Sequence, residues 1–120
     1  MKDFDFKRLN HKFKNYNITL RGGKLADGYK PDMVLCLGES YIILECENGT
    51  SRKHFIGGLL KAAKFLTGDK EGILVYVILI KKNTTERQIA KHLRPYLDWI
   101  SSLTSLREVY IISDEKYLHN

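Results

Sequence analysis

The stretch KPDMVLCLGESYIILECENG, residues 30–49, decides the fold of this 120-residue chain. Two apolar, β-branched runs flank Gly38 and Glu39, and this pattern predicts a β-hairpin. Glycine in the first position of a two-residue loop suits a type II′ turn. With this turn the numbers of paired residues sum to 77, so Asp32 is expected to lie directly across from Glu45.

Three acidic side chains share one face of this hairpin. Because side chains alternate along a strand, Glu47 lies on the face of Glu45, while Cys46 points the other way. Carboxylates that face each other across a hairpin have Cβ atoms about 4.5–5.5 Å apart and repel each other, so a divalent cation is expected between them. Mg²⁺ takes oxygen ligands, typically one or two carboxylates with water and substrate phosphate. A three-residue loop would instead pair Asp32 with Cys46 and turn Glu45 to the opposite face.

The order Pro31-Asp32, a short hairpin and then Glu45-Cys46-Glu47 resembles the PD-(D/E)XK nuclease superfamily, which has the restriction-endonuclease-like fold. The resemblance implies that Asp32 and Glu45 bind Mg²⁺, with Mn²⁺ as a substitute, and that the Cys46 carbonyl is a further ligand. Glu47 stands where the family usually has a lysine that positions or activates the attacking water. A minority of restriction endonucleases carry an acid there, and Glu47 is expected to bind a second ion or to orient the water.

Length and composition predict one domain over residues 1–120. With 43% hydrophobic residues the chain is expected to fold. No apolar run approaches the ~20 residues that span a membrane, and the N-terminus lacks the apolar segment of a signal peptide. Cys36 and Cys46 are expected on opposite faces of the hairpin, so they do not pair. Two free thiols fit a reducing compartment, and a cytoplasmic location is expected.

The formal net charge is +6, which favours a polyanionic partner. Basic residues close to the hairpin in sequence are predicted to contact nucleic acid: Lys24, Lys30, Arg52, Lys53 and His54. For the last three, balancing Glu45 and Glu47 is an equally good interpretation. The lysines of residues 3–15 are interpreted first as a solvated helix face.

Hydrophobic periodicity predicts the other elements. They are a helix over 3–15, a strand over 17–25 with a glycine bulge or bend, a helix from Ser51 to Gly68, a buried strand over 72–80, a helix from Thr85 that Pro95 must kink or divide, a strand over 108–112 and a polar tail over 113–120. The order α-β-β-β-α-β-α-β predicts an α/β fold, a mixed β-sheet flanked by helices with parallel crossovers through the two later helices. The resembled family has the same order through its fourth strand.

These patterns predict a Mg²⁺-dependent deoxyribonuclease, an endonuclease that hydrolyses phosphodiester bonds in duplex or branched DNA. A chain this short has little room for insertions that read base edges, so cleavage is expected to be structure-selective or weakly sequence-specific, as in the Holliday junction resolvases of the superfamily. A homodimer would let two sites cut two strands, with Trp99 or Tyr117 in the interface.

Other chemistries lack their motifs in this sequence. The four histidines are scattered and no CxxC pair exists, which disfavours a zinc site. Neither a GxSxG elbow nor a P-loop occurs. The alternative is a catalytically inactive nucleic-acid-binding or assembly module on the same fold, which the missing lysine favours. Lys61 and Lys64 are expected to be solvated residues too far from Glu47 to replace that lysine.

Overall fold

The computed structural model describes residues 1–81 and 84–119; residues 82–83, predicted to bound the fourth strand, and residue 120 of the predicted tail lie outside it. Five strands form one mixed sheet in the order β1-β2-β3-β4-β5. They are β1 (Asn17–Leu20), β2 (Met33–Leu37), β3 (Ser40–Glu47), β4 (Glu71–Ile78) and β5 (Leu106–Ser113). The first two pairings are antiparallel and the last two are parallel. The α/β class and the mixed sheet are therefore confirmed.

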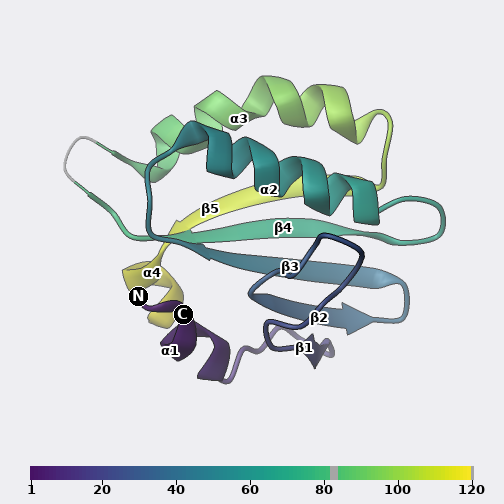
Figure 1. Cartoon of the computed structure of the whole chain (residues 1–120), viewed down its shortest axis with the longest axis horizontal. Helices are drawn as coiled ribbons and strands as arrows, with labels where there is room; N and C mark the ends of the chain where they lie inside the picture. The colour runs from purple at the N-terminus through teal and green to yellow at the C-terminus, as the bar shows by residue number, and fades with distance from the viewer. Residues whose placement is uncertain (82–83, 120) are drawn as a thin grey trace.

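Helices lie on both faces of the sheet, as Figure 1 shows. The four described helices are α1 (Asp3–Arg8), α2 (Arg52–Phe65), α3 (Glu86–Ser101) and α4 (Asp114–Leu118). One face carries α2 and α3, which provide the two crossovers between parallel strands. The other face carries α1 and α4, which bring the two chain termini close together (Figure 1). The Cα radius of gyration is 13.5 Å, close to the ~13 Å expected of a compact domain of this size.

The central hairpin has the predicted register. Leu37 pairs with Ser40 and Met33 pairs with Leu44, so paired residue numbers sum to 77. Gly38 has a φ of +62°, the left-handed value that the first position of a type II′ turn requires. As predicted, Cys46 packs on the opposite face from the acids, in the apolar cluster that α1 covers.

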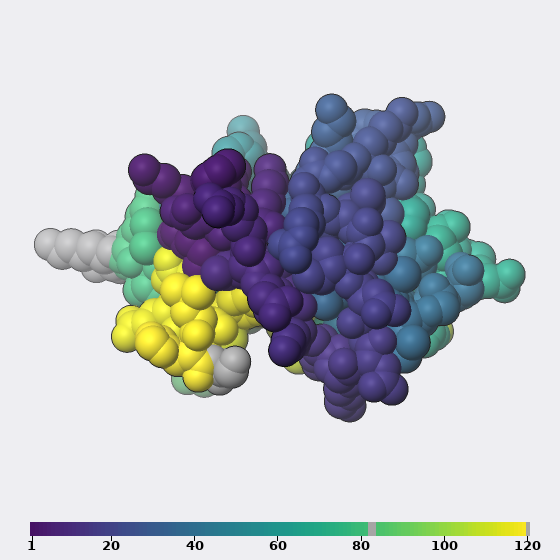
Figure 2. Space-filling model, turned by 90° about the horizontal axis from the view of Figure 1, so that it is seen from below, coloured from purple at the N-terminus to yellow at the C-terminus, as the bar shows by residue number. Residues whose placement is uncertain are grey.

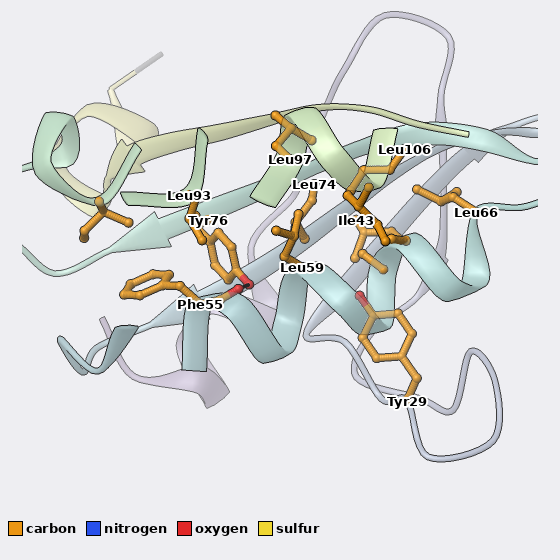
Figure 3. Packing of buried hydrophobic residues seen from close by; sticks show 14 of the residues in the cluster. Tyr29, Ile43, Phe55, Leu59, Leu66, Leu74, Tyr76, Leu93, Leu97 and Leu106 are labelled. Carbon is orange, nitrogen blue, oxygen red and sulfur yellow. Dashed lines mark hydrogen bonds between the residues drawn. The ribbon is translucent and has the colours of Figure 1, made fainter. Parts of the chain in front are cut away.

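The α2 helix packs closely on the sheet because it lacks a side chain at Gly58. A Cβ atom there would lie 2.1 Å from the hydroxyl oxygen of Tyr76 on β4. That hydroxyl donates a 2.7 Å hydrogen bond to the Phe55 carbonyl, and the two rings pack edge to face (Figure 3). Gly57 has no neighbour within 4 Å at the same position, so only one of the two glycines is needed for packing.

The predicted capping box at the start of α3 is present, with reciprocal hydrogen bonds between Thr85 and Gln88. Of the two effects predicted for Pro95, a kink or a division of the helix, the division is wrong, because α3 runs unbroken from Glu86 to Ser101. Pro95 is exposed, so the carbonyl that loses its helical donor lies on the solvent side of the helix.

The first helix is much shorter than predicted. It ends at Arg8 instead of residue 15, because the side chains of His11 and Arg21 bind carbonyls that a longer helix would use. The His11 imidazole contacts the Phe6 carbonyl at 2.7 Å. The Arg21 guanidinium donates to the carbonyls of Lys7 and Leu9 at 2.7 and 2.9 Å. These contacts take the place of the next helical turn.

The ends of the chain also differ from the prediction. The strand predicted over 17–25 ends at Leu20, its irregularity lies between Ile18 and Leu20, and the positive φ of Gly22 follows it. The residues predicted as a polar tail contain α4, whose N-cap is Ser113, so the order is α-β-β-β-α-β-α-β-α. This helix begins immediately after β5, which is longer than expected. Within residues 1–81 and 84–119, no helix is long and apolar enough to cross a membrane.

Candidate active site

Asp32 and Glu45 are held side by side by hydrogen bonds to each other's strand. The Asp32 backbone N–H donates to Glu45 Oε1 at 3.1 Å, and the Cys46 N–H donates to Asp32 Oδ2 at 2.7 Å. Both bonds cross between the start of β2 and the end of β3. The predicted juxtaposition of the two carboxylates is therefore present, and backbone donors fix one oxygen of each.

The backbone at Cys46 leaves an acceptor beside these carboxylates. In the alternation set by the Leu37–Ser40 pair, Cys46 directs both its N–H and its carbonyl toward β2. Pro31 would stand opposite Cys46 at the next position, but proline has no N–H to donate. The backbone before β2 therefore cannot donate a hydrogen bond to the Cys46 carbonyl at this position. This carbonyl oxygen is available as a ligand for a metal ion.

Burial and like charge make ionisation of this pair costly. Desolvation, followed by the charge of Asp32, raises the pKa of Glu45 to about 7. Desolvation also raises the pKa of Asp32, against the opposing effect of the Cys46 N–H. Near neutral pH the protein therefore holds a carboxyl that readily exchanges a proton, and a cation bound here would favour the ionised form.

Glu47 lies on the same face but has its own local partner. Its Oε1 accepts a 2.8 Å hydrogen bond from the Gly49 N–H, within the loop before α2. Across the described part of the chain, no three His, Cys, Asp or Glu side chains form a group that would hold a metal ion. The predicted three-acid cluster is thus a pair with Glu47 nearby. A pair still fits Mg²⁺, which often takes only one or two protein carboxylates.

Two lysines that the sequence analysis did not assign to the site lie close to the pair. Lys7 Nζ, from α1, lies 3.8 Å from Asp32 Oδ1. Lys61, on α2, is exposed as expected, yet its charge lowers the pKa of Glu45. Lys61 therefore acts on Glu45, while the expectation that it lies too far from Glu47 to replace the missing lysine stays a prediction. Lys61 follows Gly58 by three residues, and residues three apart are neighbours on the surface of a helix. Because Gly58 packs on the sheet, this spacing is the sequence signal that Lys61 lies near the sheet side of α2.

Tyr29 is a third residue near the pair that the sequence did not indicate. Its side chain is 4% exposed and extends from the connection between β1 and β2 toward the cluster under α2, as Figure 3 shows. Desolvation, and then the charge of Glu45, raise the pKa of Tyr29. Among the described residues its hydroxyl has no hydrogen-bond partner. A buried donor without a partner next to two carboxylates indicates a position for a ligand or water.

The predicted nucleic-acid contacts separate into two groups. Lys24 and Lys30 line a cavity of about 560 Å³ together with Gly28, Tyr29 and Lys61. Arg52, Lys53 and His54 do not line it; they form the first turn of α2, where Lys53 and His54 are exposed. One guanidinium nitrogen of Arg52, Nη1, is buried and lacks a hydrogen-bond partner in the part of the chain that the structure describes.

A larger cavity of about 850 Å³ lies on the other face of the sheet and is not part of this site. Strand residues such as Leu44 and Val75 line it, with Phe13 and Tyr117 from the terminal segments. Figure 2 views this side of the molecule, with the N-terminal segment and α4 beside a hollow. Its lining is mostly apolar, so it offers little to a phosphate or a cation.

No protein-family model, no curated protein and no solved structure matches this chain.

Proposed function

We propose that this protein is a metal-dependent DNA endonuclease, a variant of the PD-(D/E)XK nucleases with Glu47 in place of the usual lysine. The observation that carries the proposal is the desolvated Asp32–Glu45 pair, in which backbone N–H groups bind one oxygen of each side chain. Such fixation favours a cation site over two solvated surface acids, which would separate to reduce their repulsion.

In the proposed mechanism, Asp32, Glu45 and the Cys46 carbonyl would hold the metal ion. The chemistry that a divalent ion would supply there is polarisation of the phosphate and a lower pKa of bound water. Lys61 and Lys7 place positive charge beside the pair, where negative charge develops on the phosphate oxygens during hydrolysis. Glu47 orients water or a second ion through its other oxygen, since Oε1 is bonded to Gly49.

Metal binding and cleavage are tested separately. Calorimetry with Mg²⁺ or Mn²⁺ is expected to detect binding in the wild type and none in Asp32→Ala, with Glu39→Gln, in the exposed hairpin turn, as the matched control. The protein is then incubated with duplex, four-way-junction and single-stranded DNA plus Mn²⁺, and the products are resolved by size. Absence of both metal binding and cleavage would contradict the proposal.

The second candidate is a nucleic-acid-binding or assembly module that does not cleave. The observations that favour it are the hydrogen bond of Glu47 to its own loop and the lack of a third close acid among the described residues. DNA binding that weakens steeply with salt, without products under any metal, would support this candidate over the nuclease.

We also propose that the protein acts as a homodimer. The outer face of α3 and the turn after it carry the exposed apolar side chains Trp99, 60% exposed, and Leu103, 63% exposed. Tyr117 is a poorer candidate than the sequence indicated, because it is half-buried against Phe6 and His11. Pairing through α3 would leave the ends of β2 and β3 accessible to DNA.

A further inference from the structure

A basic cavity lies next to the carboxylate pair. Two residues of its lining, Tyr29 and Lys61, also belong to the surroundings of the pair. Lys24, Lys30 and Lys61 line the cavity, with Gly28 and Tyr29. Lys61 acts electrostatically on Glu45, and the Tyr29 hydroxyl lies in the field of both Glu45 and Asp32. Tyr29 and Lys30 also precede Asp32 by three and two residues in the chain, so the cavity lies beside the carboxylate pair.

A tight turn fixes the backbone of Tyr29 at the edge of the cavity. The Tyr29 N–H donates to the Ala26 carbonyl at 3.0 Å, and the Tyr29 carbonyl accepts from the Leu25 N–H at 3.0 Å. Gly28 has a φ of +73°, which a residue with a side chain rarely adopts. Because the turn is closed by backbone hydrogen bonds, the cavity is formed before any ligand arrives.

The charges of the cavity match an anion with several oxygen atoms. Lys24 pairs with Asp27 at 2.8 Å, whereas Lys30 and Lys61 form no ion pair within residues 1–81 and 84–119. Each ammonium group offers three donors as a compact point charge, which suits phosphate oxygens approached from several sides. Lys30 and Lys61 are both exposed, so their ammonium groups, which no carboxylate of the described residues holds in an ion pair, are accessible to an anion that enters the opening.

We propose that this cavity binds one phosphate group of a nucleic-acid strand, next to the phosphate at the carboxylate pair. Lys30 and Lys61 are the main ligands, and Lys24 contributes less because Asp27 already pairs with it. The assignment of that phosphate to a substrate strand rests on the proposed function, whereas the binding of phosphate itself does not. Lys61 lines the cavity and also acts on Glu45, so the two positions share its charge.

The test is a titration in EDTA, so that neither metal nor cleavage contributes. The amide signals of Gly28 and Lys30 are followed by NMR while inorganic phosphate, thymidine 5′-monophosphate or the dinucleotide TpT is added. Saturable shifts are expected with a phosphate ligand and none with thymidine or acetate. Preference for the monophosphate would assign the cavity to a strand end, and preference for TpT to an internal phosphate; either supports the proposal.

Lys30→Gln and Lys61→Gln are each expected to weaken phosphate binding about tenfold, the effect of losing one charged hydrogen bond. Lys64→Gln, an exposed position one turn further along α2, is the matched control and is expected to bind like the wild type. Equal weakening by Lys64→Gln, equal binding of acetate, or no effect of Lys61→Gln would overturn the proposal.

The two proposals fail in different ways. Phosphate binding that depends on Lys61, in a protein that cleaves no DNA, would keep this inference and reject the nuclease. Cleavage in which Lys30→Gln, at a residue without a role in the proposed hydrolysis, leaves KM unchanged would keep the nuclease and reject the cavity.

Discussion

Replacement of Glu45 by glutamine is expected to stabilise the protein at high pH and to change little at low pH. Burial, with the neighbouring Asp32 charge, raises the pKa of Glu45 from 4.5 to about 7. At about 1.36 kcal/mol per pH unit, the difference of roughly 2.5 corresponds to about 3 kcal/mol. Between pH 4.5 and about pH 7 the folded protein binds more protons than the unfolded chain, so the free energy of unfolding falls as pH rises. The whole decrease of about 3 kcal/mol is reached above pH 7.

Glutamine does not titrate, and its Oε1 still accepts from the Asp32 N–H. The free energy of unfolding of Glu45→Gln is therefore expected to equal that of the wild type near pH 4 and to exceed it by up to about 3 kcal/mol at pH 8. Urea unfolding in EDTA, followed by far-UV circular dichroism, measures this; Trp99 is too exposed to be a sensitive fluorescent probe.

Glu39→Gln is the control, because Glu39 is exposed in the hairpin turn. Two outcomes would refute the assignment of a buried, charge-coupled carboxyl to Glu45. One is a free energy of unfolding that varies with pH in the same way in the wild type and Glu45→Gln; the other is an equal gain in that free energy at pH 8 in Glu39→Gln. Addition of Mg²⁺ at pH 8 extends the test. A cation that binds the folded protein stabilises it, so Mg²⁺ is expected to raise the stability of the wild type and to have a smaller effect in Glu45→Gln.

Three further predictions follow from local contacts. Tyr29→Phe removes a buried hydroxyl that lacks a partner and is expected to stabilise the metal-free protein by about 1–3 kcal/mol in the same urea assay; a loss of stability would mean that the hydroxyl is bonded. Gly58→Ala is expected to destabilise by about 1–3 kcal/mol, because the new Cβ collides with Tyr76, whereas Gly57→Ala is expected to gain about 1 kcal/mol; a similar result for both would refute the packing difference. Trp99→Lys is expected to convert the proposed dimer into a monomer in analytical ultracentrifugation, and an unchanged sedimentation coefficient would contradict an interface at Trp99.

Local chemistry determined the parts of the fold that depend on neighbours in the chain. The two-residue turn at Gly38 and the alternation of apolar residues specify the hairpin register, since a shift by one residue would reverse every side chain. That register alone places Asp32 beside Glu45 and turns Cys46 away. The capping box at Thr85 likewise needs only residues three positions apart.

Tertiary contacts decided what local patterns could not. The apolar spacing of residues 3–15 is helical, but His11 and Arg21 bind the carbonyls where the helix would continue. The approach of Tyr29 and Lys61 to Glu45 depends on how the β1–β2 connection and α2 lie on the sheet. The spacing of Lys61 from Gly58 indicates only a side of the helix and does not encode the distance to Glu45. The raised pKa of Glu45 has the same origin, because desolvation is a property of the packed surroundings and not of the residue.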